Sequence, residues 1–248
     1  DDKFLKKILR KKNKSNIITY GFENGSDLHP YNVKNSGKMM FFNISVKLNN
    51  KVEHIKNIEL NLLGKHNVLN ATAAIGVAKS LGIKNNTIKA TLKNFLGVQR
   101  RLTKITNFRG SEIYDDYAHH PTEIISVLNA IKSGFKEKKI VTVFQPHRYS
   151  RVASLKKEFA NAFKDSDLVV LCPIYAASEK PIKNINHYEL AKLINKNSKK
   201  DVICIENQFD LERFIKRHTY GNEVIVCMGA GSISGWIREI AVNLKNEH

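Results

Sequence analysis

One short segment of the sequence concentrates side chains that can bind a cation or take part in acid–base chemistry. It reads Asp115-Asp116-Tyr117-Ala118-His119-His120-Pro121. Two carboxylates, a phenol and two imidazoles thus lie within six residues, after the strand-like run 112–114 and before an amphipathic helix that begins with proline. In an α/β sheet the turn from a strand to a helix lies at the carboxyl edge, where such folds bind their ligands.

The helix that follows this segment has an unusual residue at its start. A helix that begins with proline favours Ser, Thr, Asp or Asn immediately before it, and this sequence has His120. We therefore expect the segment to contribute little to the stability of the helix and to serve a ligand instead. The alternative is a polar turn in which the histidine is satisfied by local hydrogen bonds.

A second strand end carries positive charge. The run Gln145-Pro146-His147-Arg148-Tyr149-Ser150-Arg151 follows the apolar residues 139–144. Arg148 and Arg151 are three residues apart, so one helical turn would place them on the same side. Guanidinium groups bind carboxylates and phosphates in two-point geometry, whereas the carboxylates of the first segment suit Mg²⁺. A solvated turn with two surface arginines is the alternative. A third strand end, 175–181, is interpreted as a rim loop or as a plain turn.

Three further motifs bear on nucleotide binding. Asn67 and Asn70 lie in the first turn of a predicted helix, and an asparagine amide can both donate to and accept from an adenine edge; helix capping would explain one of them better than both. Residues 229–235 read Gly-Ala-Gly-Ser-Ile-Ser-Gly. Ser234 replaces the third glycine of a dinucleotide fingerprint, and the motif lies in the last strand–helix unit, so we interpret a close-packed turn. The chain contains no G-x-x-x-x-G-K-[S/T] phosphate-binding loop.

The composition is that of a globular protein with an excess of positive charge. Lys and Arg number 41 against 23 Asp and Glu, which gives a formal net charge of +18. The lysines are scattered, and neither a nucleic-acid module nor a basic stripe interleaved with aromatic residues is present. Nucleic acid is therefore not expected as a partner.

The apolar segments and the cysteines indicate a cytoplasmic protein. No apolar run of about 18 residues is present, so no membrane-spanning helix is expected, and the first residues show no apolar signal-peptide core. The three cysteines, Cys172, Cys204 and Cys227, lie within apolar, strand-like runs. Their spacing fits neither a metal site nor a disulfide framework, and we expect buried, reduced thiols.

The first part of the chain is expected to combine strands with two long helices. A short basic helix is expected at 3–12, and strands at 16–22, at 39–46 and near 52–58, separated by turn signals. Helical spacing then predicts a helix that ends at Gly82 and a second one from Asn86 to Phe95. A domain boundary is placed after Arg101, which gives domains 1–101 and 102–248.

From about residue 104 strands and helices alternate. This alternation predicts a mostly parallel sheet with right-handed crossovers, a Rossmann-like doubly wound α/β domain. The strands are expected at 112–116, 140–145, 167–172, 202–206 and 223–228. The helices are expected at 121–134, 154–164, 187–196, 208–217 and 233–244.

Four motifs in a fixed order resemble those of the Mur ligases, over nearly the whole chain. They are Gly64-x-His66-Asn67-x-x-Asn70-Ala71, Arg100-Arg101, the segment 115–121, and Gln145-Pro146-His147-Arg148-x-x-Arg151. The resemblance implies that 1–101 is the latter part of a central ATP-binding domain and that 102–248 is the C-terminal Rossmann-like ligase domain. The UDP-binding domain and the phosphate-binding loop of the family would lie upstream, so we expect a C-terminal fragment that is inactive without its N-terminal domains.

Within the family, the motifs are most similar to the branch that joins L-alanine to UDP-N-acetylmuramate in peptidoglycan precursor synthesis. The resemblance implies that the muramate carboxylate takes the γ-phosphoryl group of ATP, with Mg²⁺ as cofactor, and that the alanine amine attacks the acyl phosphate. The branch that recycles murein tripeptide is an alternative, because it shares Asp-Asp-x-x-His-His-Pro, although it typically has Glu-Pro-Arg-Ser at 145–148. A non-catalytic module that binds anions or nucleic acid is the other alternative.

The resemblance also implies roles for individual residues. The nucleotide contacts would be Asn67 and Asn70 at the adenine, and Arg101 and Asp116 at the ribose and phosphates. The catalytic residues, facing the acyl phosphate and the alanine, would be His119, His120, Arg148 and Arg151. Substrate contacts would be Tyr117 and His147. No metal ligand is expected in this chain, because the magnesium-binding residues of the central domain would lie upstream.

Overall fold

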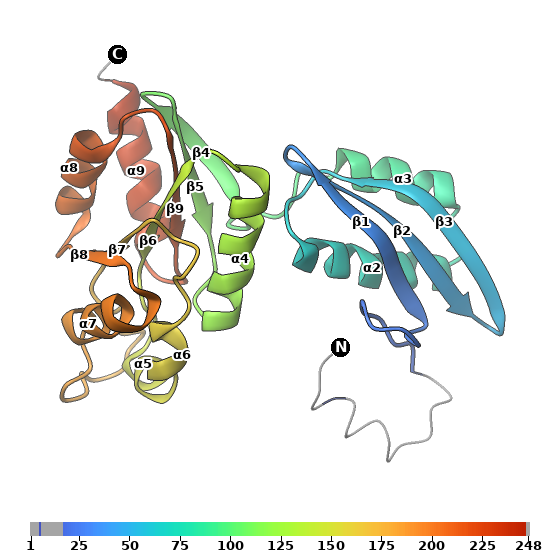
Figure 1. Ribbon diagram of the computed structural model, residues 1–248, viewed down its shortest axis with the longest axis horizontal. Helices are drawn as coiled ribbons and strands as arrows, with labels where there is room; N and C mark the ends of the chain where they lie inside the picture. The colour runs from blue at the N-terminus through green and yellow to red at the C-terminus, as the bar shows by residue number, and fades with distance from the viewer. Residues whose placement is uncertain (1–4, 6–16, 247–248) are drawn as a thin grey trace. The chain divides into compact units, whose positions relative to one another are not determined.

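The computed structural model describes Leu5 and residues 17–246, and the chain divides into two compact units between Leu96 and Gly97 (Figure 1). The sequence-based boundary lies a few residues later, so Arg100 and Arg101 fall in the C-terminal unit. The helix expected at 3–12 lies outside the described residues, apart from Leu5. Among the residues that the structure describes, no helix has the length and apolar character needed to span a membrane.

The N-terminal unit is a three-stranded antiparallel sheet with two helices packed on it. Its elements are β1 (Leu28–Ser36), β2 (Met39–Leu48), β3 (Lys51–Leu60), α2 (Lys65–Ser80) and α3 (Asn85–Asn94). Alternate residues of β2 are buried, because one face of the sheet meets the helices. Asn49 and Asn50 have φ angles of 50° and 59°, which suit the two-residue turn between β2 and β3. Both predicted helices and the two later predicted strands are confirmed.

The prediction of a strand at 16–22 is wrong. In the described part of this segment only Tyr20 pairs with a strand, through an isolated bridge to β1. Asp27 holds the segment instead, because Thr19 N and Thr19 Oγ1 donate to Asp27 Oδ2 at 2.8 and 2.6 Å. The first strand of the sheet is β1, which contains Pro30 and a register shift. These features obscure a strand in the sequence, but an edge strand tolerates them.

The C-terminal unit is a six-stranded sheet in the order β4-β5-β9-β6-β7-β8. Its strands are parallel except for β4, which pairs antiparallel with β5. The strands are β4 (Thr103–Phe108), β5 (Ser111–Asp116), β6 (Lys139–Phe144), β7 (Leu168–Leu171), β8 (Asp201–Cys204) and β9 (Glu223–Met228). The helices are α4 (Pro121–Gly134), α5 (Tyr149–Ser154), α6 (Lys156–Ala160), α7 (His187–Ser198), α8 (Gln208–His218) and α9 (Ile233–Lys245). With α4 on one face and α8 and α9 on the other (Figure 1), the predicted doubly wound α/β fold is confirmed.

Two features of this unit differ from the prediction. β4 is an additional edge strand that the sequence did not reveal, because its exposed edge position leaves only two of its residues buried. The single helix expected at 154–164 is replaced by α5 and α6, because Leu155 leaves helical geometry with φ −113° and ψ 27°. The short helix α5 begins directly after Arg148 and so overlaps the segment 145–151, which follows β6.

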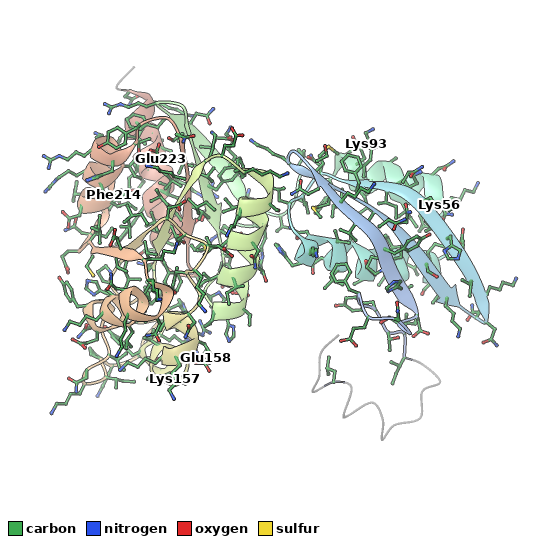
Figure 2. The ribbon with its side chains drawn as sticks, viewed as in Figure 1. Lys56, Lys93, Lys157, Glu158, Phe214 and Glu223 are labelled. Atoms are coloured by element: carbon green, nitrogen blue, oxygen red, sulfur yellow. The ribbon has the colours of Figure 1, made fainter. Side chains whose placement is uncertain are left out.

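The core of this unit is built around β9, which lies between β5 and β6 and is buried along its whole length. Its residues after Glu223 are all apolar, as expected for a parallel strand covered on both faces. Figure 2 shows Glu223 and Phe214 of α8 within this unit, and Phe214 packs in the cluster on the α8–α9 side of the sheet. The thiols of Cys172 and Cys227 are free and buried, and burial raises the pKa of both. Cys204 is free and partly buried.

Candidate functional site

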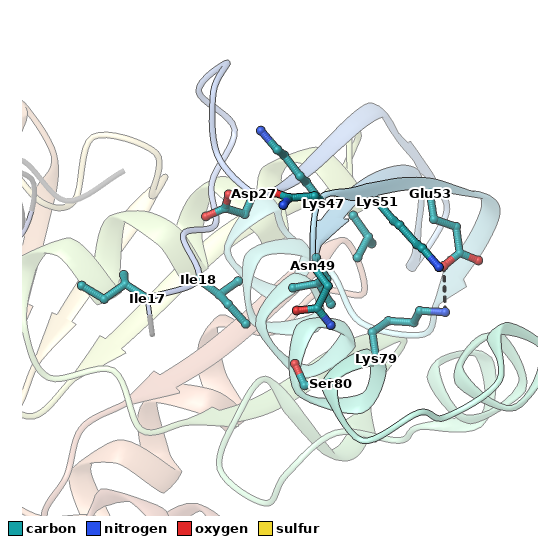
Figure 3. A pocket seen from close by; sticks show the side chains of 12 residues that line it. Ile17, Ile18, Asp27, Lys47, Asn49, Lys51, Glu53, Lys79 and Ser80 are labelled. Atoms are coloured by element: carbon teal, nitrogen blue, oxygen red, sulfur yellow. Dashed lines mark ion pairs between the residues drawn. The ribbon is translucent and has the colours of Figure 1, made fainter. Parts of the chain in front are cut away.

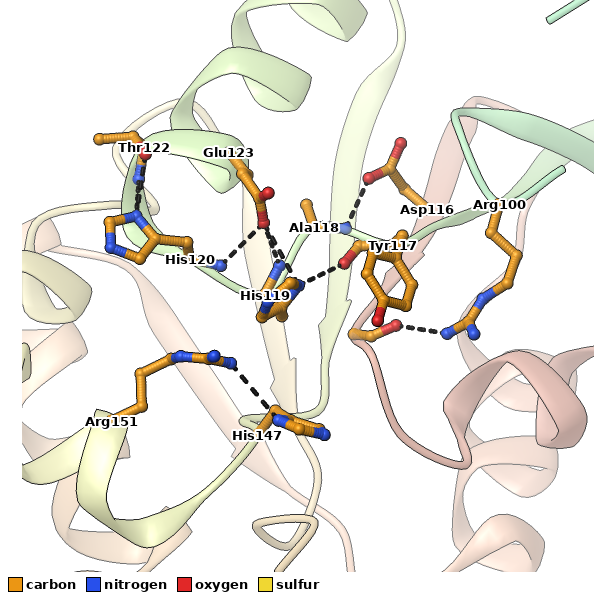
Figure 4. Close-up of polar contacts among 11 residues, drawn as sticks. Arg100, Asp116, Tyr117, Ala118, His119, His120, Thr122, Glu123, His147 and Arg151 are labelled. Atoms are coloured by element: carbon orange, nitrogen blue, oxygen red, sulfur yellow. Dashed lines mark hydrogen bonds and ion pairs between the residues drawn. The ribbon is translucent and has the colours of Figure 1, made fainter. Parts of the chain in front are cut away.

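The carboxyl ends of β5, β9 and β6 meet at one edge of this sheet. Gly229 N, just after β9, donates to Asp116 O at 3.1 Å, and Gln145 N, just after β6, donates to Met228 O at 2.9 Å. The segments 115–121 and 145–151, which follow β5 and β6, therefore lie on either side of the glycine-rich turn. Figure 4 shows the polar groups that gather there.

Asp116 is one of two buried carboxyl groups at the end of β5, with 3% of its surface exposed, against 0% for Asp115. Its Oδ1 accepts from Ala118 N and its Oδ2 from Leu102 N, both at 2.7 Å. Burial raises the pKa of Asp116 to about 6, against the opposing effects of the two backbone donors and of the Arg101 guanidinium. Asp116 thus ties the segment before β4 to the segment after β5.

The raised pKa of Asp116 predicts how the stability of the C-terminal unit depends on pH. The folded state binds this proton more tightly than the unfolded state, so the stabilising contribution is complete below pH 3.8 and is lost as pH rises through about 6. Between pH 5 and 7 the free energy of unfolding should fall by about 1 kcal/mol through this group. Urea unfolding at both pH values, followed by the fluorescence of Trp236, the single tryptophan, measures the change. Asp116→Asn should lack this component, and an identical pH dependence in both proteins would contradict the prediction.

Arg100 and Arg101 both lie against the ring of Tyr117. Their guanidinium carbons are 4.6 and 5.7 Å from the ring centroid, within the range of cation–π attraction. Arg100 Nη2 also donates to Gly229 O at 2.8 Å. Arg100 therefore anchors the loop before β4 to the glycine-rich turn, a role that the sequence did not reveal beyond the presence of two adjacent arginines.

The two histidines of the first segment have different environments. His120 is the N-cap of α4: its Nδ1 accepts from Thr122 N at 3.4 Å, and the Glu123 carboxylate accepts from His120 N at 3.1 Å. The expectation that this segment does little for the helix is therefore wrong, because His120 and Glu123 form a reciprocal cap. His119 is held through Nδ1, which lies 2.9 Å from Tyr117 O and 3.3 Å from Glu123 Oε2.

The second strand end places His147 beside Tyr175. Their rings stack with centroids 5.4 Å apart, and Arg148 N donates to Tyr175 O at 2.9 Å. Arg151 Nη1 donates to His147 Nδ1 at 3.4 Å. Burial lowers the pKa of His147, and the charges of Arg151, His119 and Arg148 act in the same direction. The rings of His147 and His119 are 5.9 Å apart (Figure 4), so the two strand ends share one site.

The loop after β7 and the turn after β9 pack against this second strand end. Glu179 accepts from Ser150 N at 2.9 Å and from Ser150 Oγ at 2.6 Å, so it satisfies donors at the start of α5. A Cβ atom on Gly231 would lie 2.5 Å from Gln145 Oε1 and 2.5 Å from Tyr175 Cγ. The interpretation of the glycine-rich run as a close-packed turn is confirmed. Tyr175 is a member of the site that the sequence does not predict, since 175–181 is interpreted only as a rim loop or a plain turn.

Asn67 and Asn70 lie in the N-terminal unit and are in contact with each other. Asn67 Nδ2 donates to Leu63 O at 2.7 Å, and Asn70 Nδ2 donates to Asn67 Oδ1 at 3.3 Å. The N-cap of α2 is Gly64, without a side-chain hydrogen bond. Capping in the usual sense therefore does not explain either asparagine, and their contact with adenine stays a prediction.

A cavity of about 760 Å³ in the N-terminal unit lies beside the β2–β3 hairpin and the end of α2 (Figure 3). Its lining includes the ion pair between Lys79 Nζ and Glu53 Oε2, which are 2.8 Å apart. None of the site residues expected from the sequence lines this cavity. We therefore place the candidate site at the sheet edge of the C-terminal unit.

Two domain families match the chain. The glutamate ligase domain of the Mur ligases matches residues 100–231, and the Mur ligase middle domain matches residues 1–78. This chain belongs to the Mur ligase family. Its site residues from the strand ends all fall within the stretch that matches the glutamate ligase domain, whereas Asn67 and Asn70 fall within the middle domain match.

Individual Mur ligases are similar over nearly the whole chain. The UDP-N-acetylmuramate–L-alanine ligase of Pelagibacter ubique is 45% identical over 97% of this chain and 52% of its own length. The protein of the same name from Ruthia magnifica is 40% identical over 94% of this chain and 50% of its own length. The chain thus spans about half the length of the curated relatives it matches.

Solved Mur ligase structures share the fold. The crystal structure of UDP-N-acetylmuramate-alanine ligase from Thermotoga maritima superposes with a TM-score of 0.76, at 27% identity, over 93% of this chain and 48% of that one. The murein peptide ligase of Psychrobacter arcticus superposes with a TM-score of 0.63, at 22% identity, over 92% of this chain and 46% of that one. At 22% identity, the comparison with the murein peptide ligase supports the fold and nothing about function.

Proposed function

We propose that this chain is part of an ATP-dependent ligase that joins L-alanine to UDP-N-acetylmuramate in cytoplasmic peptidoglycan precursor synthesis. One observation carries the proposal: a buried carboxyl group, two imidazoles and two arginines come from the ends of β5 and β6, on either side of β9, to one sheet edge. Relatives named for this reaction support the choice of substrates. Because the chain spans about half of those relatives, the activity is proposed for the full-length ligase.

In the proposed first step, the muramate carboxylate attacks the γ-phosphorus of ATP, and an acyl phosphate and ADP form. Positioning and charge neutralisation supply most of the acceleration of such a transfer. Arg148 and Arg151 suit the phosphoryl oxygens or the carboxylate of the amino acid, because a guanidinium binds both with two parallel hydrogen bonds. Arg101 and Asp116 are the proposed contacts of the phosphates and the ribose of the nucleotide, although both Asp116 oxygens already accept from backbone N–H groups.

In the proposed second step, the amine of L-alanine attacks the acyl carbon. The C–N bond forms, the bond from the acyl carbon to the phosphate oxygen breaks, and inorganic phosphate leaves. His119 and His120 are the proposed catalytic histidines, although His120 Nδ1 is already occupied by its capping contact with Thr122. Tyr117 and His147, which flank His119, are the proposed substrate contacts.

The nucleotide and the metal fit this chain only in part. Asn67 and Asn70 offer amides to an adenine, but no G-x-x-x-x-G-K-[S/T] loop is present to hold the phosphates. Among the described residues, no group of three or more His, Cys, Asp and Glu side chains is placed to bind a metal ion. Mg²⁺ would neutralise phosphate charge during the transfer, and we place its ligands elsewhere in the full-length ligase.

Mass spectrometry of the products tests the proposed function. The full-length ligase is incubated with ATP, UDP-N-acetylmuramate and either L-alanine or murein tripeptide. We expect one ADP for each alanyl product. Preference for the tripeptide would support the recycling branch instead. Absence of ADP release, together with a salt-dependent mobility shift of DNA or RNA, would support a nucleic-acid-binding module.

A further inference from the structure

The partners of His119 locate the hydrogen on its ring. Nδ1 lies 2.9 Å from Tyr117 O and 3.3 Å from Glu123 Oε2. A carbonyl oxygen and a carboxylate oxygen accept hydrogen bonds, so Nδ1 must carry the hydrogen and donate it. In the neutral ring, Nε2 is then unprotonated and can accept a proton.

The ring of His147 is held in the opposite tautomer. Its Nδ1 meets Arg151 Nη1 at 3.4 Å, and arginine has no acceptor, so Nδ1 accepts and the hydrogen of the neutral ring lies on Nε2. Figure 4 shows His119, His147 and Arg151 turned toward one another. In the neutral rings, His119 Nε2 is therefore a hydrogen-bond acceptor and His147 Nε2 is a hydrogen-bond donor.

One carboxylate oxygen organises the loop around His119. Glu123 Oε2 accepts from His119 N at 2.9 Å and from His120 N at 3.1 Å, in addition to its contact with His119 Nδ1. A helix cap requires only the backbone contacts. The contact with Nδ1 is additional, and a carboxylate there stabilises an imidazolium, as the aspartate of a Ser-His-Asp triad does.

We propose that His119 Nε2 takes the proton released by the incoming amino acid, and that Glu123 is the positioning residue that keeps His119 in the required tautomer. This inference rests on the proposed ligase function. An amino acid arrives as an ammonium ion, whose nitrogen has no free electron pair. One N–H proton passes to Nε2, and the freed pair forms the C–N bond. A second N–H proton then leaves the nitrogen for the departing phosphate, which takes the electrons of the broken C–O bond, so that the amide nitrogen keeps one hydrogen.

The test compares two nucleophiles in the full-length ligase. L-Alanine must lose a proton before it attacks, whereas hydroxylamine is neutral at pH 7 and traps the acyl phosphate without a base. Glu123→Gln keeps an oxygen that can accept the backbone hydrogen bonds of the cap but removes the charge. Glu189→Gln is the matched control, because Glu189 occupies the same position in α7 and pairs with Lys192 instead of a histidine. Histidine ¹⁵N shifts of the present chain report the tautomers independently of activity.

We expect Glu123→Gln to slow alanyl product formation roughly tenfold or more, and His119→Ala roughly a hundredfold or more. Both of these variants should retain hydroxamate formation. The control variant Glu189→Gln should retain alanyl product formation and hydroxamate formation. The ¹⁵N shifts should show His119 protonated at Nδ1 and His147 at Nε2. Equal losses with both nucleophiles, or a neutral His119 protonated at Nε2, would overturn the inference while ADP release by the wild-type ligase would still support the proposed function. Absence of ADP release by the wild-type ligase would overturn both.

Discussion

Arg148→Ala is expected to lower kcat/KM of the full-length ligase for L-alanine by about 1000-fold or more, because a preorganised charge opposite developing negative charge is lost. The fold should survive, since Arg148 is exposed and its structural contact comes from the backbone, where N donates to Tyr175 O at 2.9 Å. Its φ of 70° lies in the left-handed region, which costs a non-glycine residue on the order of 1 kcal/mol. Steady-state kinetics and the melting temperature measure both parts of this prediction.

Two further variants make the Arg148 result specific. Arg148→Lys keeps the charge but loses the planar fork, so its kcat/KM should fall between those of the wild type and Arg148→Ala. Arg213→Ala removes an exposed arginine of α8, with 61% of its side chain exposed, and should leave turnover unchanged. Near-normal turnover of purified Arg148→Ala would show that this guanidinium has no part in the reaction.

Glu223→Ala is expected to cost the C-terminal unit about 3 kcal/mol of folding free energy, because it removes the acceptor of one buried and three partly buried donors. Glu223 is 5% exposed. Its Oε2 accepts from Ser111 Oγ at 2.5 Å and from the backbone N of Tyr220, Gly221 and Asn222 at 3.0, 3.0 and 3.1 Å. Urea unfolding followed by Trp236 fluorescence measures the loss.

The pKa of Glu223 gives the direction of its pH dependence. Burial acts to raise this pKa, but the hydrogen bonds from Ser111 and the backbone outweigh it and hold the pKa below its usual value. The stabilisation is therefore complete above the unfolded-state pKa and is lost as pH falls through the lower folded-state value. Glu137→Ala, at an exposed glutamate of the same unit, serves as the control. A Glu223→Ala protein as stable as this control would refute the role of the carboxylate.

Much of the C-terminal fold was predictable because its elements have strong local patterns. β9 is a continuous apolar run, and α4 begins at Pro121 and repeats its buried positions with helical spacing. The first strand of the N-terminal sheet was not predictable, because β1 contains Pro30 and a register shift that interrupt the alternating pattern of a strand.

The site was predictable to the extent that it follows from topology. Parallel strands end at the same edge, so the segments after Asp116 and after Phe144 were expected to meet once the alternation was recognised. Tyr175 was not predictable, because its contact with His147 depends on the register of β6 against β7. The capping role of His120 was not predictable either, because it depends on where the Glu123 side chain lies.

If this chain supplies one part of a divided ligase site, it should bind ATP weakly by itself, because it contains no G-x-x-x-x-G-K-[S/T] loop to hold the nucleotide phosphates. The most direct measurement is a calorimetric titration of ATP with Mg²⁺ into the present chain and into the full-length ligase. We expect no micromolar binding to the present chain and clear binding to the full-length ligase. Micromolar binding of ATP to the present chain alone would contradict the claim.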